Sequence, residues 1–330
     1  MAKYGGIDLG GTKIQAVIVD EDHKVLGQAR RPTPTEGGPE DVAKEMAQAL
    51  RDAAKAAKLE PAALKGIGVG SPGVIEGGNV STARNLPGWE GTFGLAKALK
   101  SALGVGGISV KIGNDVQVAT GAELKLGAGR PYESLIGVFW GTGVGAGLIL
   151  DGKPWLGQGG AGEIGHMVVK MNGARCTCGR RGCVEAYAGR AAMEIQVRKL
   201  HEKGRHTDLF KLMKEHDRTR LTSGIWERAL AHEDMLATEL IERAIQALGA
   251  GIASAVNLFD VPAVIIGGGL GVRLGDPYAK RITEAMQPHL FADDRPPDVK
   301  VAALGDLGGA IGASLLVELD EAGVPGTAVA

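Results

Sequence analysis

A short pattern that occurs twice constrains the fold of this chain more than any other feature. Residues 10–20 align without a gap on residues 141–151, and in each copy an apolar run precedes a turn with Gly and Thr, then a second apolar run ending in Asp. Two such runs around a glycine-containing turn are typical of a β-hairpin. We therefore expect two related lobes that each offer one hairpin turn to a shared cleft. Coincidence between glycine-rich hairpins is the alternative.

The remaining pattern indicates an α/β protein. Apolar runs of strand length alternate with longer segments of helical period, the clearest of which are 40–57 and 236–256. Because several strands are joined as hairpins, we expect mixed sheets. The expected strands are residues 4–9, 14–20, 66–70, 109–112, 135–140, 145–150, 263–266 and 299–304.

Composition excludes several classes of protein. The 330 residues suggest two domains, and a net charge of −1 without a long basic stripe disfavours nucleic-acid binding. No uncharged stretch reaches the roughly 18 apolar residues of a membrane helix. The N-terminal residues lack the apolar core of a signal peptide, so we expect a cytoplasmic protein.

The first copy of the repeat has the residues of a phosphate site. Gly10 and Gly11 would offer backbone N–H groups to an anion, Thr12 a hydroxyl, Lys13 a positive charge, and Asp8 a ligand for Mg²⁺. The second copy, Gly141-Thr142-Gly143, could grip the same polyphosphate from another side. A structural turn is the alternative, since the spacing of a P-loop is absent.

Two more glycine motifs are candidates for nucleotide binding, and the residues around them decide between the two. Gly68 to Gly73 match the G-x-G-x-x-G dinucleotide fingerprint, but Pro72 and the next residues predict a turn and a strand instead of the required helix, so we reject that site. Gly267, Gly268 and Gly269 come after a buried strand and would allow a flat ligand such as adenine to approach the backbone.

The cysteines indicate a metal site. Cys176, Cys178 and Cys183 lie in one short segment, and with His166 they supply the ligands of a closed tetrahedral Zn²⁺ site, which is the structural type. Free buried thiols are the alternative, although a loop rich in Gly and Arg offers no core for them.

Carboxylates and amides could bind a polyhydroxylated ligand. Asn114 and Asp115 follow a strand, at the edge where α/β folds place ligands. Glu163 precedes His166 by three residues and Glu185 follows Cys183 by two, so a metal would fix both. Asn85 belongs to a loop with Trp89 that could line a sugar pocket. For any single carboxylate a surface or capping role is the alternative.

Together these motifs resemble the ROK family of sugar kinases and repressors, from about Tyr4 to Leu316, and within it the bacterial ATP-dependent glucokinases. The resemblance implies a two-domain actin-like ATPase fold of hexokinase type, an α/β fold with mixed sheets and an interdomain cleft. The small domain would comprise residues 1–115 and about 305–330, and the large domain, with the zinc loop, residues 116–304. The resemblance also implies a homodimer or homotetramer.

The resemblance also implies a role for each matching residue. Asp115 would be the catalytic base, and His166 would serve both zinc and sugar. The sugar would be bound by Gly73, Asn85, Asn114, Asp115, Glu163, His166 and Glu185. Mg²⁺ and ATP would be held by Asp8, Gly10, Gly11, Thr12, Lys13, Gly141, Thr142, Gly143, Gly267, Gly268 and Gly269.

The predicted activity is phosphoryl transfer from Mg·ATP to the 6-hydroxyl of glucose. Kinases of N-acetylglucosamine, N-acetylmannosamine or fructose are alternatives, because the resemblance implies the same residues for them. A non-catalytic sugar sensor and a polyphosphate-dependent kinase are further alternatives, the latter without the broad basic groove that it would need.

Overall fold

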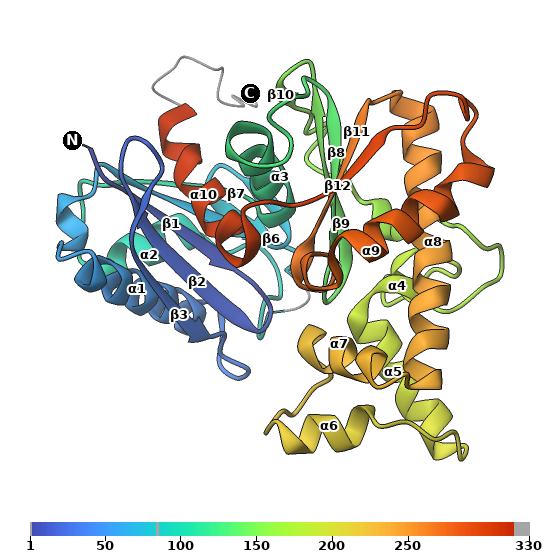
Figure 1. Cartoon of the computed structure of the whole chain (residues 1–330). Helices are drawn as coiled ribbons and strands as arrows, with labels where there is room; N and C mark the ends of the chain where they lie inside the picture. Colours follow the sequence, from blue (N-terminus) through green and yellow to red (C-terminus); the bar gives the residue numbers. More distant parts are fainter. Residues whose placement is uncertain (1, 84–85, 320–330) are drawn as a thin grey trace. The chain divides into compact units, whose positions relative to one another are not determined.

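The chain forms two α/β units, which the computed structural model describes for residues 2–83 and 86–319 (Figure 1). Unit 1 comprises Met1–Gly127, Leu156–Gly160 and Asp306–Ala330, and unit 2 comprises Ala128–Trp155 and Ala161–Gly305. The boundary expected at residue 115 falls inside unit 1, because helix α3 (Asp115–Leu126) packs against helix α10 (Gly308–Leu319) of the same unit.

Unit 1 is built on a mixed sheet with the strand order β3-β2-β1-β4-β7. The first three strands are antiparallel, and β4 and β7 continue parallel to β1. The strands are β1 (Tyr4–Leu9), β2 (Lys13–Val19), β3 (Val25–Pro32), β4 (Gly66–Ser71) and β7 (Ser109–Asn114), with a separate hairpin of β5 (Val74–Glu76) and β6 (Asn79–Ser81).

Unit 2 has a sheet of the same design, β10-β9-β8-β11-β12, again with three antiparallel strands followed by two parallel ones. Its strands are β8 (Leu135–Trp140), β9 (Val144–Leu150), β10 (Lys153–Pro154), β11 (Ala263–Gly267) and β12 (Asp298–Val301). The repeat in the sequence therefore corresponds to hairpins at equivalent places in two sheets, which confirms the mixed sheets and the internal relationship.

The two hairpins differ by one residue in their connections. Leu9 pairs with Ile14, whereas Trp140 pairs with Val144. The first turn is closed by a hydrogen bond from the Gly10 N–H to the Lys13 carbonyl (2.9 Å), and the second by one from the Gly141 N–H to the Gly143 carbonyl (3.0 Å). In the second strand of the hairpins, the gapless sequence alignment is therefore one residue out of step with the structural equivalence.

Strand β2 shows why the unit 1 sheet is apolar on both faces. Ile14, Ala16 and Ile18 pack in one core cluster with helix α1 (Pro39–Ala56), while Val17 and Val19 pack in another with helix α10. Successive side chains of a strand point to opposite faces, so a strand covered on both sides is a continuous apolar run. Helix α2 (Leu95–Leu103) joins α1 in the first cluster.

Helix α10 lies unusually close to the sheet because two strand glycines leave room for its backbone. A Cβ built on Gly6 would lie 1.9 Å from the Ala310 carbonyl oxygen, and one on Gly68 would lie 1.7 Å from that of Ala313. No side chain fits such gaps, so these two glycines allow the backbone of α10 to lie directly against the sheet.

Unit 2 adds helices between its metal loop and its long helix. Helix α8 (Met235–Phe259) contacts α4 (Glu185–Ala188), α5 (Arg190–Glu202), α7 (Ser223–Ala231) and α9 (Gly268–Met286), and α6 (Leu209–Glu215) packs on α7. This segment contributes Val197, Leu212 and Trp226 to the core.

Most expected elements are present and a few differ. The helices expected at 40–57 and 236–256 correspond to α1 and α8, and β5 is the strand expected after Pro72, while strands β3, β6 and β10 were not predicted. The last strand is shorter than expected, since β12 ends at Val301. One further hydrogen bond, from the Ala302 N–H to the Ile266 carbonyl (2.9 Å), follows it.

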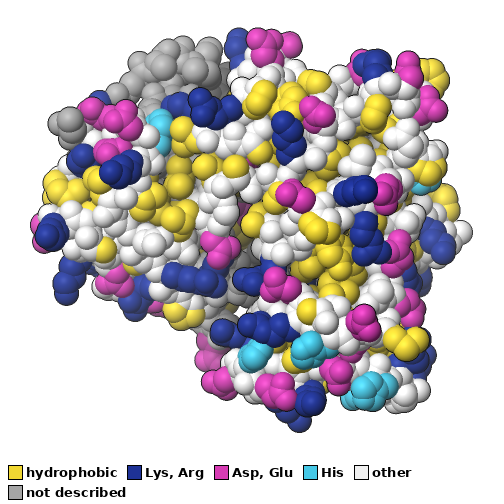
Figure 2. All heavy atoms as spheres, viewed as in Figure 1, with side chains coloured by type: hydrophobic (Ala, Val, Ile, Leu, Met, Phe, Trp, Pro, Cys, Tyr) yellow, Lys and Arg dark blue, Asp and Glu magenta, His cyan; other side chains and the backbone are white. Residues whose placement is uncertain are grey.

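The surface and the helices agree with the composition. Lys and Arg side chains alternate with Asp and Glu over the face shown in Figure 2, in keeping with the formal net charge of −1. Within residues 2–83 and 86–319, no helix combines the length and the apolar character needed to cross a membrane.

The close approach of α10 gives a stability prediction. Gly68→Ala should lower the free energy of unfolding by about 3 kcal/mol, because the added methyl group displaces the helix backbone. Gly121→Ala is the matched control: it lies in helix α3 with open space around it, and should raise stability by up to about 1 kcal/mol. Urea unfolding measures both. Equal effects of the two changes would contradict this account of the packing.

Candidate active site

Asn114 and Asp115 lie where strand β7 ends and helix α3 begins. Asn114 caps the helix: its Oδ1 accepts hydrogen bonds from the N–H groups of Val116 (3.1 Å) and Gln117 (3.2 Å). Asp115 occupies the first helical position, where its Oδ1 also accepts from the Val116 N–H (2.9 Å). A carboxylate in the first turn is stabilised by the helix dipole. The carboxyl group of Asp115 is thus held in a fixed orientation at the carboxyl end of the strand.

Gly73 is brought to the same place. The Asn114 amide donates to the Gly73 carbonyl (3.4 Å), and strand β4, which precedes Gly73, pairs with β7 up to Asn114. Gly73 has φ +97°, and a Cβ on it would lie 2.4 Å from the Ser81 carbonyl oxygen. Only glycine fits this turn, so Gly73, Asn114 and Asp115 form one group in unit 1.

The neighbouring loop is the one expected to carry Asn85 and Trp89. Asn85 lies outside the described residues. Trp89 is buried, with its ring edge-on to Phe93 (centroids 5.5 Å apart) and its Nε1–H donating to the Val80 carbonyl (3.1 Å). Trp89 is therefore an anchor of the loop within the core and not an exposed sugar platform.

Asp8 is the penultimate residue of strand β1, beside the first hairpin turn. Burial is the main cause that raises its pKa to about 6. The positive charge of Lys13 acts to lower this pKa, and the negative charge of Asp306 acts to raise it. Lys13 Nζ lies 3.6 Å from Asp306 Oδ1. Gly309 is packed against the carboxyl group, since a Cβ there would lie 2.8 Å from Asp8 Cγ. This group can hold a divalent cation, because oxygen ligands are what Mg²⁺ prefers.

Thr33 braces this turn and was not predicted. Its hydroxyl donates to the Gly10 carbonyl (2.6 Å) and its N–H donates to the Thr12 carbonyl (3.3 Å). Thr33 follows strand β3 and is buried. The turn that carries Gly10, Gly11 and Thr12 is therefore fixed from the neighbouring edge strand.

The second turn, residues 141–143, is fixed by helices α4 and α5. The N–H groups of Arg190 and Ala191 donate to the carbonyls of Gly141 (3.1 Å) and Thr142 (3.0 Å). The Arg190 guanidinium donates from Nη2 to Thr142 Oγ1 (2.7 Å). Glu185 accepts the Val144 N–H at Oε2 (3.0 Å). Arg190 is another residue that the sequence did not indicate.

The triple glycine lies next to this turn and differs from the expectation in one respect. A Cβ on Gly141 would lie 3.8 Å from the Gly269 N, and one on Gly268, which has φ +79°, would lie 2.6 Å from the Trp140 carbonyl oxygen. Gly268 and Gly269 begin helix α9, so this segment is the N-terminus of a helix as well as a turn. Backbone N–H groups at such an end favour an anion.

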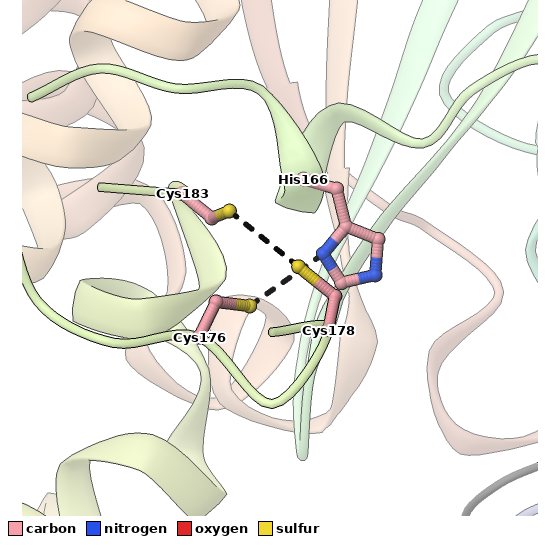
Figure 3. Close-up of side chains that lie close together, drawn as sticks. All are labelled: His166, Cys176, Cys178 and Cys183. Carbon is pink, nitrogen blue, oxygen red and sulfur yellow. Dashed lines mark hydrogen bonds between the residues drawn. The ribbon is translucent and has the colours of Figure 1, made fainter. Parts of the chain in front are cut away.

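The four expected metal ligands come together in one cluster (Figure 3). The ligand atoms of His166, Cys176, Cys178 and Cys183 all lie within 4.8 Å of one another. Cys176 Sγ is 3.7 Å from His166 Nδ1, and Cys178 Sγ is 3.7 Å from Cys183 Sγ. A disulfide needs about 2.05 Å, whereas sulfur ligands at about 2.3 Å from a tetrahedral metal are about 3.8 Å apart. The spacing fits four-coordinate metal binding.

The electrostatics of the thiols agree with a cation site. Burial acts to raise the pKa of Cys178, but hydrogen bonds from Arg180 outweigh it and bring that pKa to about 6. Burial and the neighbouring thiols raise the pKa of Cys183 to about 11. Thiolates at this separation repel one another, so all three ionise together only around a cation, which binds them in that form.

Glu163 and Glu185 flank the cluster as expected. Glu163 Oε2 is 3.8 Å from His166 Nε2, the ring nitrogen that faces away from the thiols. Glu185 accepts from the Thr177 hydroxyl at Oε1 (3.4 Å) as well as from the Val144 N–H. It therefore links the metal loop to the second turn, a role that the sequence did not suggest.

The comparisons with known proteins identify the class. The ROK family profile matches residues 4–319, so the chain belongs to the ROK family. A glucokinase from Thermotoga maritima is 31% identical over 96% of this chain and 97% of its own length. An N-acetylgalactosamine kinase from a Shewanella species is 30% identical over 97% of this chain and 98% of its own.

A solved structure confirms the fold class. A ROK family glucokinase from Streptomyces griseus, crystallised with glucose and AMPPNP, has a TM-score of 0.81 and is 27% identical, covering 96% of this chain and 100% of that one. The fold is thus the α/β actin-like ATPase fold of hexokinase type. All three relatives are named as sugar kinases, and the matches cover nearly their full lengths. The comparisons therefore support sugar kinase as the class of activity.

The thiol cluster gives a prediction on metal content. The purified protein should hold about one divalent ion per chain, and Cys178→Ala should lose it and lower the Tm by more than about 5 °C. Met171→Ala changes an exposed side chain of the same loop and should alter neither value. Elemental analysis and calorimetry are the measurements. Unaltered protein that holds no metal, purified without chelator, would contradict the assignment.

The pKa of Asp8 gives a prediction on stability. Its folded-state pKa, about 6, lies above the ordinary 3.8, so folding stability is lost as the pH rises between these values and stays lost above them. Asp8→Asn removes this cost and should stabilise the protein by about 3 kcal/mol at pH 8, with little effect below pH 4.

Denaturant unfolding at several pH values tests this dependence. Asp22→Asn changes an exposed acid after strand β2 and is the matched control, with an expected effect below about 0.5 kcal/mol. An Asp8→Asn effect of the same size at pH 4 and pH 8 would show that Asp8 has an ordinary pKa.

Proposed function

We propose that this chain is an ATP-dependent kinase that transfers the γ-phosphoryl group to the 6-hydroxyl of glucose. The observation that carries the proposal is Asp115, held by hydrogen bonding at the start of helix α3 with Asn114 and Gly73 beside it. A carboxylate at this place in a ROK family protein matches what a hydroxyl nucleophile needs, a base that accepts its proton.

Asp115 would act as that base. Its carboxylate accepts the proton of the 6-hydroxyl as the oxygen attacks the γ-phosphorus and the bond to the leaving ADP oxygen breaks. The positive end of helix α3 favours the ionised form of Asp115 before the reaction. Asp8 would hold Mg²⁺, directly or through water, and the ion when bound neutralises charge on the phosphates.

Groups that would bind the hydroxyls of the sugar occur in each unit. Asn114 and Gly73 are candidates in unit 1, together with Asn85, and Glu163, His166 and Glu185 are candidates in unit 2. His166 turns Nδ1 toward Cys176, which leaves Nε2 beside Glu163 for a hydroxyl group. One oxygen of Glu185 already accepts the Val144 N–H, so the sugar would use the other.

The metal of the thiol cluster would be Zn²⁺ in a structural role. Three thiolates and one imidazole complete a tetrahedral shell and leave no open position for substrate. Such a site stabilises the loop from which Glu185 emerges and the short 3₁₀ helix (Ile164–His166) that follows Glu163.

The donor would be ATP, held by Gly10, Gly11, Thr12 and Lys13 in unit 1 and by the Gly141–Gly143 turn and the triple glycine in unit 2. Glucose is favoured by the glucokinases among the relatives, although kinases of N-acetylgalactosamine, N-acetylglucosamine and N-acetylmannosamine are among them too. A homodimer or homotetramer and a cytoplasmic location stay predictions. Light scattering on the purified protein measures the first of these.

Replacement of Asp115 tests the catalytic base. Asp115→Asn keeps an acceptor for the Val116 N–H but removes the base, so kcat should fall by a factor of about 10³, while the Kd for glucose changes less than about threefold. Steady-state kinetics and calorimetric titration with glucose are the measurements. Near-full turnover of Asp115→Asn would disprove the assignment.

A matched control separates loss of the base from loss of a charge. Asp260→Asn makes the same chemical change at the C-cap of helix α8, where φ is +48°, a conformation that Asn tolerates. Its kcat should equal that of the unaltered protein.

A further inference from the structure

Arg190, the first residue of helix α5, holds the Gly-Thr-Gly turn of unit 2 with its backbone and its side chain. Its N–H donates to the Gly141 carbonyl (3.1 Å), its Nη2 to Thr142 Oγ1 (2.7 Å) and its Nη1 to the Leu221 carbonyl (2.8 Å). No motif in the sequence pointed to this residue, because Thr142 is 48 positions away.

The guanidinium of Arg190 has no close counter-charge. In the described part of the chain no carboxylate forms an ion pair with it, and Glu194, the nearby acid, is bonded to Arg198 (2.6 Å) and lies 3.9 Å from Arg220. Burial, and then the charge of Arg220, lower the pKa of Arg190 below its ordinary value, and the charge of Glu194 opposes them only in part. A guanidinium nevertheless stays protonated in proteins. A partly buried cation without an ion-pair partner is costly, and an anionic ligand would offset that cost.

Part of the hydrogen-bonding capacity of Arg190 is also unused. Its Nε is buried and has no hydrogen-bond partner among the described residues. Buried polar groups in native proteins almost always have a partner, so an orphaned donor in a guanidinium that contacts a functional turn calls for an explanation.

The contact with Thr142 sets the direction of the threonine hydroxyl. A guanidinium can only donate, so Thr142 Oγ1 is the acceptor and its own hydrogen is directed elsewhere. The backbone N–H groups of Thr142 and Gly143 make no hydrogen bond within the described residues. The turn thus offers a hydroxyl and two N–H donors next to a positive charge that has no ion-pair partner.

We propose that Arg190 is a positioning residue for the phosphoryl donor, which orients Thr142 to donate to the β- and γ-phosphates of a nucleoside triphosphate and supplies positive charge beside them. This inference rests on the proposed function and adds to it a residue outside the expected site. Arg190 acts through Thr142, whose hydroxyl contacts the ligand.

Nucleotide binding to the full chain tests the proposal, with Mg²⁺ present and AMPPNP compared with AMP. Arg190→Met should raise the Kd for AMPPNP by about 10- to 100-fold and change the Kd for AMP by less than about threefold, because AMP lacks the outer phosphates. Arg190→Lys should recover part of the loss, since lysine keeps the charge without the planar fork.

Thr142 variants test the route of the effect. Thr142→Val should weaken AMPPNP binding about tenfold and Thr142→Ser should restore it. If Arg190 acts through Thr142, Arg190→Met combined with Thr142→Val should bind AMPPNP more tightly than the product of the single effects predicts. The Thr142 variants also keep the proposal testable if Arg190→Met does not fold. Arg205→Met, which removes a surface cation paired with Glu239 (2.9 Å), is the control and should leave both affinities unchanged.

Two outcomes would overturn the inference. Unchanged AMPPNP affinity in Arg190→Met would remove the role of Arg190, and equal loss for AMP and AMPPNP would show a merely structural contact. Failure of the proposed function is seen separately in the unaltered protein, which would then bind neither nucleotide, and that result would overturn both.

Discussion

Four metal-ligating side chains held within 4.8 Å of one another are the constraint on which the site in unit 2 depends. Neutral thiols would gain little from such a cluster, and thiolates would repel one another, so a cation is what makes this arrangement favourable. Two side chains close to the ligands in sequence are fixed as a consequence. Glu163 stands beside the outer nitrogen of His166, and Glu185 reaches from the metal loop to the Val144 N–H.

The same chain of contacts continues from the metal loop to the phosphate turn. Glu185 holds one end of residues 141–143, and Arg190 holds the other through Gly141 and Thr142. The residues proposed to bind the sugar and those proposed to bind the donor in unit 2 therefore share one support. Under the proposed function, a change in the metal loop affects the binding of both substrates and not of the sugar alone.

Unit 1 shows a different physical compromise. Asp8 is half-buried near the end of β1, where ionisation costs stability, and Gly309 of α10 leaves room for its carboxyl group because glycine has no Cβ. A buried carboxylate beside a turn with backbone donors is costly to an empty protein and useful once a cation binds. Asp115 is the opposite case, since helix α3 stabilises its charge.

Sequence reasoning recovered what local patterns encode. The repeated hairpins, the cysteine cluster and the position of Asn114 and Asp115 at the end of a strand each depend on neighbouring residues, and the rejected dinucleotide fingerprint is indeed followed by strand β5 and not by a helix. Strand β3 was missed because charged and polar residues at this sheet edge hide its period. Thr33 and Arg190 were missed because their partners, Gly10 and Thr142, lie 23 and 48 positions away, and no spacing rule encodes such contacts. Asn85 lies outside the described residues.

The most direct test of the central claim is ADP release from Mg·ATP with glucose, mannose, fructose, N-acetylglucosamine, N-acetylmannosamine and N-acetylgalactosamine, each offered separately, with polyphosphate as a second donor. The account predicts rapid ADP release that depends on glucose and is slow with the other sugars. Turnover with an acetamido sugar alone would keep the kinase and correct the substrate. Sugar binding without ADP release from any of them would contradict the claim and favour a sensor.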